Sequence, residues 1–258
     1  MPKRKDTPPP VAETFLPVMP RRTLVGAEDA LKRASRCSDI TRHEARNFNN
    51  LEFNKISFTG EDLSSCRANY SKFTDCEFSD CNFEHTEFLY SVFENCRFNN
   101  CRLEESDFSY AILDKVSFTS CNLNSSDFPY ARGEVTLKSC LMTRCTAFYS
   151  ALKLTLSDTA AVAFRANVAE VDLDAVRSSF RNGEFNDSTL RGSIVKTDLT
   201  RSEFNRADMS QLKITDCPGT PMGGDEEVWY EDIPDNELID IFSSKLDSDF
   251  DIDSEFDE

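Results

Sequence analysis

The chain has very few of the side chains on which most enzyme mechanisms depend. Among its 258 residues there are two histidines, His43 and His85, although histidine is the side chain best suited to carry protons and metal ions near neutral pH. The sequence contains no CxxC pair, HExxH, P-loop or nucleophile-elbow motif. We therefore expect no catalytic residue, no metal site and no cofactor, and predict that the protein is not an enzyme.

Long apolar runs are also absent. No stretch approaches the roughly 20 apolar residues that a membrane-spanning helix needs. The start, MPKRKDTPPP, is basic and proline-rich, and no apolar signal-peptide core follows it. These features predict a protein without membrane contact, in the cytoplasm.

What the chain does contain is a five-residue rhythm. Every fifth residue from Phe48 to Phe128 gives 17 positions, and 16 of them are Phe or Leu. An α-helix has a period of 3.6 residues and a strand a period of 2, so neither produces this pattern. A short fixed period predicts a solenoid, whose coils bury their apolar side chains against the coils above and below.

A second set of small residues lies two positions before each Phe or Leu. Six of the ten cysteines belong to it: Cys66, Cys76, Cys81, Cys96, Cys101 and Cys121. Cysteine without a partner behaves as a small buried hydrophobe, so this placement favours free thiols and a reducing cytosol rather than a disulfide framework.

If four five-residue units form one coil, residues 20 apart should stack. The sequence supports this, because like residues recur at that spacing. The predicted core columns are Phe58, Phe78, Phe98 and Phe118, and Cys81, Cys101 and Cys121. Residues 47–130 then form a regular tract of about four coils.

The rhythm breaks at residues 129–134, where Pro129 and Gly133 predict a turn or a small protruding loop. A less regular tract of about four coils follows at 131–216. Its register is open between residues 155 and 177, and one residue is dropped near Ile194. We expect a β-bulge near residues 192–196.

The two ends differ in composition from the repeat. Residues 1–24 form a basic, proline-rich arm, residues 25–46 are expected to form a short helical cap, and residues 217–258 form an acidic tail with a short amphipathic helix. The tail is either a solvated segment or a docking peptide. Its candidate partner-binding residues are Trp229, Tyr230, Phe250, Ile252 and Phe256.

Units such as SDFSY (106–110), CNFEH (81–85) and ADMSQ (207–211) resemble the pentapeptide-repeat family. The resemblance covers roughly residues 46–215. It implies an all-β solenoid, a right-handed quadrilateral β-helix, which we expect to have about eight coils. The Phe/Leu position and the small position would both point inward.

The Phe- and Cys-rich units at 73–83 and 93–103 resemble a subgroup of that family, the quinolone-resistance proteins that bind DNA gyrase. This resemblance implies a non-enzymatic, DNA-mimicking binder of a topoisomerase and a role in antibiotic resistance. Residues 48–130 carry 6 basic and 14 acidic residues, and an acidic rod can compete for a basic DNA channel. The candidate partner-binding acids are Asp75, Glu77, Asp80, Glu84, Glu87, Glu94, Glu104, Glu105 and Asp107.

Three features depart from that subgroup. The second tract carries 12 basic and 11 acidic residues, no long projecting loop is evident, and the acidic tail is additional. The alternative function is therefore an interaction scaffold or effector that presents the arm and the tail to a protein partner, without direct nucleic-acid binding. A homodimer through one solenoid end is also possible on this sequence. One continuous negative face would favour mimicry, and dispersed charge would favour the scaffold.

Overall fold

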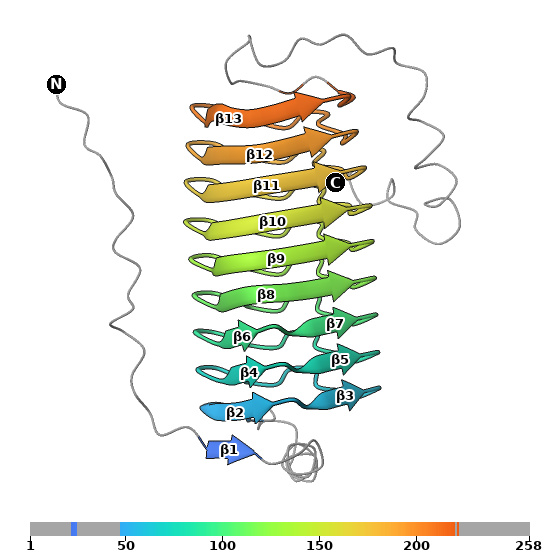
Figure 1. Ribbon diagram of the computed structural model, residues 1–258, viewed down its shortest axis with the longest axis vertical. Helices are drawn as coiled ribbons and strands as arrows, with labels where there is room; N and C mark the ends of the chain where they lie inside the picture. Colours follow the sequence, from blue (N-terminus) through green and yellow to red (C-terminus); the bar gives the residue numbers. More distant parts are fainter. Residues whose placement is uncertain (1–21, 25–46, 220, 222–258) are drawn as a thin grey trace, which may run out of the picture.

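The computed structural model describes residues 22–24, 47–219 and 221, which form a parallel β-solenoid of about nine coils (Figure 1). At the front of Figure 1 the strands run from left to right while the coils rise, so the solenoid is right-handed. This confirms the predicted fold class, with about one coil more than expected. The predicted helical cap, the arm before Arg22 and residues 220 and 222–258 of the acidic tail lie outside the described residues, among which no helix is found.

All strands pair in parallel within one 13-stranded sheet. The three short strands β2, β4 and β6 lie on one side of the rod, and β3, β5 and β7 lie on the next; from β8 onward one longer strand covers both sides. The strands are β1 (Arg22–Leu24), β2 (Leu51–Asn54), β3 (Ser57–Thr59), β4 (Lys72–Thr74), β5 (Glu77–Ser79), β6 (Val92–Glu94), β7 (Arg97–Asn99), β8 (Ile112–Thr119), β9 (Arg132–Lys138), β10 (Ala151–Ser157), β11 (Glu170–Val176), β12 (Thr189–Val195) and β13 (Asp208–Thr215).

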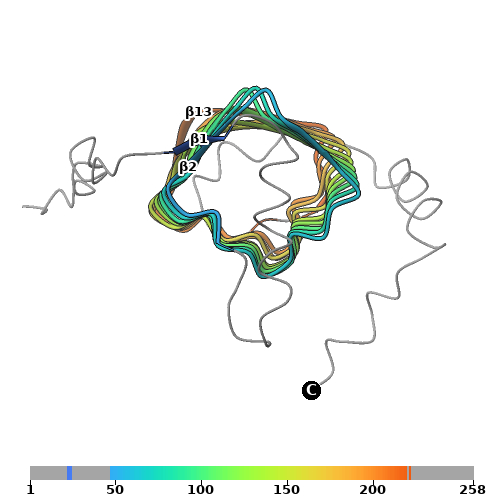
Figure 2. The ribbon, with the colours of Figure 1, turned by 90° about the horizontal axis from the view of Figure 1, so that it is seen from below.

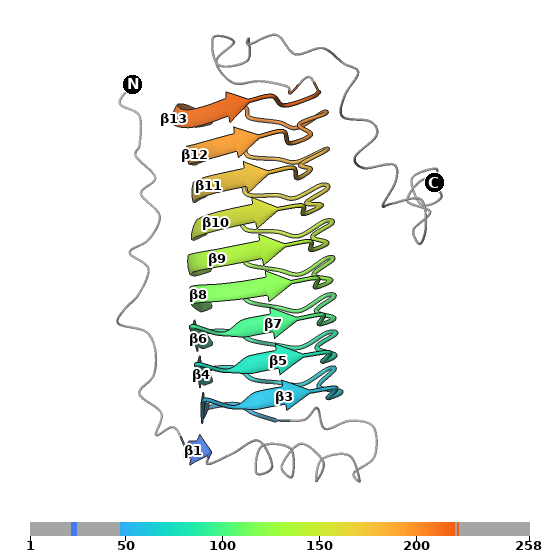
Figure 3. The same ribbon diagram turned by 45° about the vertical axis from the view of Figure 1, so that its right-hand side comes forward.

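The chain turns at regular left-handed corners. In one coil, Asp75, Asp80, His85 and Tyr90 have φ values of 53°, 55°, 56° and 57°. A residue in the left-handed region bends the chain from one side to the next, so a corner every five residues closes a coil of four sides, seen end-on in Figure 2. The corners stack from coil to coil along the rod (Figure 3).

We number the sides by their inward residues in the lower coils. Side 1 carries Phe53 and Phe73, and side 2 carries Phe58 and Phe78. Side 3 begins with Leu63 and side 4 with Phe48; isolated parallel bridges connect the coils on both.

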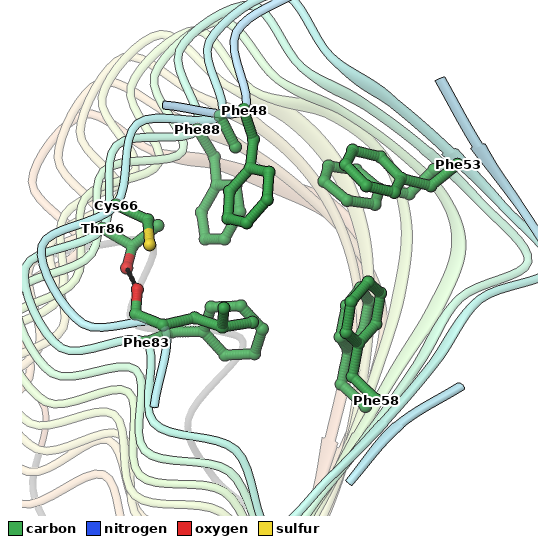
Figure 4. Close-up of a pocket in the computed structure, with 11 residues that line it drawn as sticks. Phe48, Phe53, Phe58, Cys66, Phe83, Thr86 and Phe88 are labelled. Atoms are coloured by element: carbon green, nitrogen blue, oxygen red, sulfur yellow. Dashed lines mark hydrogen bonds between the residues drawn. The ribbon is translucent and has the colours of Figure 1, made fainter. Parts of the chain in front are cut away.

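Stacked phenylalanines fill the centre of the lower coils. Phe78 stacks on Phe98 with ring centroids 4.6 Å apart, and Phe98 stacks on Phe118 at 4.8 Å. At the lower end, the rings of Phe48, Phe53 and Phe58 point toward the axis (Figure 4). Burial of these apolar columns is the main stabilising contribution to the fold.

The small inward residues also link neighbouring coils. The Thr86 hydroxyl donates a hydrogen bond of 3.0 Å to the carbonyl of Leu63 (Figure 4), and the Ser91 hydroxyl donates one of 2.7 Å to Ala68. The Sγ atom of Cys101 lies 3.4 Å from the carbonyl oxygen of Phe78 in the same way. Ser, Thr and Cys therefore alternate at this position because each is small and can donate a hydrogen bond.

The coil shortens from 20 to 19 residues at Gly133. Strand β9 pairs with β8 across a register shift between Leu113 and Val116. Above it, no described residue between sides 1 and 2 has a φ close to the 54° of Lys115. Gly133 and Gly192 have positive φ values of 130° and 102°, but they pair with Leu113 and Leu173 rather than continuing the Lys115 corner. The dropped residue is thus the corner residue, and the two sides merge into one strand.

Two sequence predictions need correction here. The predicted turn at 129–134 is present only as the ordinary corner at Pro129 and Tyr130, and the alternative of a protruding loop is wrong, because Arg132 already begins strand β9 and the ladder continues through it. The predicted bulge at 192–196 is also misplaced: residues Arg191–Val195 pair without interruption with β13, and the register shift lies between Thr189 and Arg191.

The stretch between residues 155 and 177 follows the same 19-residue register. Leu152 pairs with Val171, and Val171 pairs with Leu190. The interval from one inward residue to the next falls to four once per coil, as from Leu152 to Leu156. The residue dropped near Ile194 is therefore one instance of a step that recurs in the coils of β9 to β12, whereas β13 pairs with β12 at a spacing of 20 residues from Arg191 onward.

Candidate partner-binding surface

The nine acidic residues proposed as a binding face do not share one side of the rod. The twenty-residue register assigns them to all four sides. Side 1 carries Asp75 and Glu94, side 2 carries Glu77 and Asp80, side 3 carries Glu84, Glu104 and Glu105, and side 4 carries Glu87 and Asp107. The lower coils therefore have dispersed negative charge rather than one acidic face.

Basic side chains neutralise several of these carboxylates. Lys72 pairs with Glu94 at 2.7 Å, and Arg102 pairs with Glu84. His85 lies 3.1 Å from Glu105. Asparagine amides bind others, as where Asn95 donates to Asp75 at 2.7 Å. Exposed pairs of this kind contribute about 0–1 kcal/mol each to stability, but they reduce the field that a partner would meet.

Side 4 brings three carboxylates into one column. Bridges connect Arg67 to Glu87, Glu87 to Asp107, and Asp107 to Asp127. Neighbouring coils are about 4.8 Å apart, so the three acids are stacked closely. Arg67 pairs with Glu87 at 3.3 Å, at the lower end of the column. Asp127 was not among the residues predicted from the sequence.

The corner beside this column carries a continuous ladder of tyrosines. The rings of Tyr70, Tyr90, Tyr110, Tyr130 and Tyr149 stack with centroids 5.1, 4.6, 4.6 and 5.2 Å apart, and with planes within 11° of parallel. Each tyrosine comes two residues before a strand, so the ladder follows the edge where β4, β6, β8, β9 and β10 begin (Figure 1, left).

This corner also holds the exposed apolar surface of the rod. Among the described residues, three large apolar side chains are classed as exposed: Tyr110 at 41%, Tyr149 at 42% and Val168 at 41%. Val168 is the next corner residue above Tyr149. An apolar stripe of this kind, next to charged residues, is typical of a protein interaction site.

An intermediate column joins the tyrosines to the acids. It contains the half-buried residues Leu89, Pro129 and Phe148. The Asn69 amide in the same column donates a hydrogen bond of 3.0 Å to Glu87, and Ser109 donates to Asp107. We call the combined patch the tyrosine–acid surface: Tyr70, Tyr90, Tyr110, Tyr130, Tyr149, Leu89, Pro129, Phe148, Glu87, Asp107 and Asp127.

Burial suppresses ionisation of the Cys145 thiol in the core. Desolvation raises the pKa of the Cys145 thiol to about 12, and its Sγ lies 2.9 Å from the Leu123 carbonyl oxygen. No group of three or more potential metal-ligating side chains is found within the described part of the chain. The space between the lowest coils is lined by apolar rings such as Phe53 and Phe83 (Figure 4). No helix of the described residues is long and apolar enough to cross a membrane.

The other predicted positions divide into two groups. The core residues are all buried: Phe58, Phe78, Phe98, Phe118, Cys81, Cys101 and Cys121. The five tail positions, namely Trp229, Tyr230, Phe250, Ile252 and Phe256, lie outside the described residues.

The geometry thus defines a parallel β-solenoid built from five-residue units with a stacked aromatic corner. Residues 71–152 match the family model described as "Pentapeptide repeat region". Residues 71–152 are thus a pentapeptide-repeat region, and the parallel ladder continues from them into the coils on both sides.

Solved structures with a similar fold were also found. One is HetL, a pentapeptide repeat protein involved in heterocyst differentiation regulation from the cyanobacterium Nostoc sp. strain PCC 7120. It has 15% identity and a TM-score of 0.44, over 75% of this chain and 94% of that chain. Another is a trypsin-treated form of QnrB1, a plasmid-mediated fluoroquinolone resistance protein, with 15% identity and a TM-score of 0.29 over 66% and 91% of the two chains. No curated protein sequence matches the chain significantly.

Proposed function

We propose that this protein is a non-enzymatic protein-binding rod and that the tyrosine–acid surface is its main contact area. The ladder of five stacked tyrosines carries this proposal. Tyrosine supplies a large contact area with few rotatable bonds, and it is enriched at protein interfaces. The parallel ladder beneath it holds these side chains in fixed positions, so little ordering is required on binding.

The neighbouring charges indicate the chemistry of the partner. Glu87, Asp107 and Asp127 form the acidic margin of the surface. A partner with an apolar strip and arginine or lysine side chains along one margin would match it. Electrostatic complementarity of this kind favours fast and selective association.

Affinity purification from cells of the native host tests the proposal. The wild-type rod is compared with a Tyr90→Asn, Tyr110→Asn, Tyr130→Asn variant, because Asn tolerates the left-handed corner conformation. The matched control replaces three exposed corner residues between sides 1 and 2: Asp75→Ser, Asn95→Ser and Lys115→Ser. A partner recovered by the wild type and the control but lost with the tyrosine variant supports the function. Equal recovery by all three proteins contradicts it.

A topoisomerase such as gyrase is the second candidate partner, through DNA mimicry. The observation in its favour is the regular stacking of acids on side 4, together with the side 1 column of Glu94 and Asp114. The dispersed and paired charges on sides 2 and 3 favour the general scaffold instead. The purified protein should alter gyrase supercoiling at low micromolar concentration, and a Glu87→Gln, Asp107→Asn, Asp127→Asn variant should lose that effect. An inactive wild-type protein excludes this partner.

A further inference from the structure

The tyrosine ladder presents ring edges rather than ring faces. Because each ring stacks on the next at 4.6–5.2 Å, the faces inside the ladder cover one another. The edges and hydroxyl groups remain available, as the 41% exposure of Tyr110 shows. Extended proline-rich segments bind to grooves lined by aromatic side chains and lose little conformational entropy on docking, so a row of exposed aromatic side chains offers them a matching contact.

Strand β1 connects the N-terminal segment to the lower end of this ladder. Arg22 pairs with Leu51, and Leu51 directly follows Asn50. Asn50 is the left-handed corner residue of the first coil, at φ 59°, as Tyr70 is in the second coil at φ 60°. The chain therefore joins the rod beside the column that continues upward as Tyr70, Tyr90 and Tyr110.

The composition of the segment before Arg22 is complementary to this surface. Residues 1–21 contain six of the ten prolines, and they carry Lys3, Arg4, Lys5 and Arg21 against Asp6 and Glu13. The side 4 acids Glu87, Asp107 and Asp127 have the opposite charge and flank the three middle rings of the ladder, whereas Arg67 and Thr146 lie beside its two ends. On the other flank lie Lys72, Val92, Ile112 and Arg132, and Lys72 already pairs with Glu94. The acids thus lie on one margin only.

The segment is also long enough. The ladder from Tyr70 to Tyr149 spans about 20 Å, which is four coil spacings. A polyproline II segment rises about 3.1 Å per residue, so about seven residues cover this span. The 21 residues before Arg22 therefore reach the upper end of the ladder with residues to spare.

We propose that residues 1–21 bind the tyrosine–acid surface of their own chain, with the prolines against the tyrosine edges and Lys3, Arg4 and Lys5 beside the acids. The segment then competes with the external partner for the same surface and regulates its binding. The regulatory role rests on the proposed function, whereas the intramolecular contact does not.

Zero-length carbodiimide cross-linking of the full chain tests the contact. The monomeric product is isolated and mapped by mass spectrometry. We expect amide bonds from Lys3 or Lys5 to Glu87, Asp107 or Asp127, at least fivefold more abundant than bonds to the control acids Asp75 and Asp80. A Tyr110→Asn, Tyr130→Asn variant should lose this preference, and Tyr110→Phe, Tyr130→Phe should keep it. Equal labelling of all five acids, or cross-links confined to dimers, overturns the proposal.

Partner capture separates this inference from the proposed function. A Lys3→Glu, Arg4→Glu, Lys5→Glu variant should recover at least twice as much partner as the wild type, because its surface is no longer covered. Unchanged recovery together with absent cross-links rejects self-binding and leaves the binding function intact. Cross-links without any tyrosine-dependent partner reject the function and leave the intramolecular contact intact.

Discussion

Tyr110 stacks on Tyr130 with ring centroids 4.6 Å apart and ring planes 2° from parallel, although the two residues are 20 positions apart in the sequence. Both side chains stand on left-handed corners with φ near 60°. The corner fixes the direction of each ring, and the ladder spacing fixes the distance. A surface feature of the rod is therefore set by its backbone repeat.

Tyr90 should titrate at unusually high pH. Burial, followed by the neighbouring Tyr110 and Tyr70, raises the pKa of Tyr90 above its ordinary value. The folded state thus holds this proton more tightly than the unfolded chain does. Its stabilising effect is complete below about pH 10 and is lost as pH rises through the folded pKa. The absorbance difference at 295 nm between wild type and Tyr90→Phe measures this pKa. A midpoint at or below that of free tyrosine contradicts the prediction.

Gly133 should tolerate no side chain. It has φ 130°, and an added Cβ would lie 2.1 Å from the Leu113 carbonyl oxygen. We expect Gly133→Ala to lower the free energy of unfolding by about 2–4 kcal/mol, because backbone must move. Gly60→Ala is the control, since nothing lies within 4 Å of the added carbon there. Denaturant unfolding of both variants gives the comparison, and equal losses would refute the close approach.

Phe98 should contribute more stability than Phe48. Phe98 is fully buried and stacks on a ring both above and below. We expect Phe98→Ala to cost about 3–5 kcal/mol. Phe48 lies at the lower end of the described coils and makes an edge contact with Phe53, so Phe48→Ala should cost less. Calorimetric melting of the two variants distinguishes them; a larger loss at Phe48 would show that the centre of the rod is not its most tightly packed part.

Replacing Val168 should stabilise the protein. This β-branched residue occupies a left-handed corner at φ 57° and is 41% exposed. Asparagine adopts that conformation more readily, so we expect Val168→Asn to gain about 0.5–1 kcal/mol. The reciprocal change, Asn182→Val at φ 55°, should lose a similar amount. Chemical denaturation measures both, and a destabilised Val168→Asn would mean that apolar contact outweighs backbone strain.

The Cys145 thiol should resist alkylation in the native state. With its pKa raised to about 12, Cys145 is almost entirely protonated at pH 8. The pKa of Cys217 is also raised by burial, yet this residue is only half-buried. Iodoacetamide at pH 8 should therefore label Cys217 before Cys145, as read by peptide mass spectrometry. Reversed order would indicate that the upper coils open locally.

The sequence was a good guide to the lower coils and a poorer one above them. The period of five follows directly from burial, because Phe78, Phe98 and Phe118 share one environment. In the shortened upper coils the buried positions are harder to recognise from the sequence. Leu154 and Leu156 are both buried on one strand, and a period of five misses one of them. A search at a period of 19 would have aligned Phe185 with Phe204, which stack at 5.1 Å.

The distribution of charge in the sequence predicted only part of the candidate surface. The candidate acids were selected by their density along the chain. This criterion grouped Glu77 with Glu87, although the two residues lie on different sides of the rod. Sequence spacing rather than density carries the needed signal: Tyr70, Tyr90 and Tyr110 are 20 residues apart. The pairing of Lys72 with Glu94 depends on which coils stack, and composition does not contain that information.

Because the corner above Lys115 is missing, the lower and upper coils of the rod have different shapes. A uniform repeat would present the same surface at every level, and a partner could bind at several equivalent heights. Here four-cornered coils lie below Gly133 and coils with a merged side lie above it. A partner that contacts both regions meets them together at one height only. The step in the coil thus favours binding of one partner molecule per rod, in a single orientation.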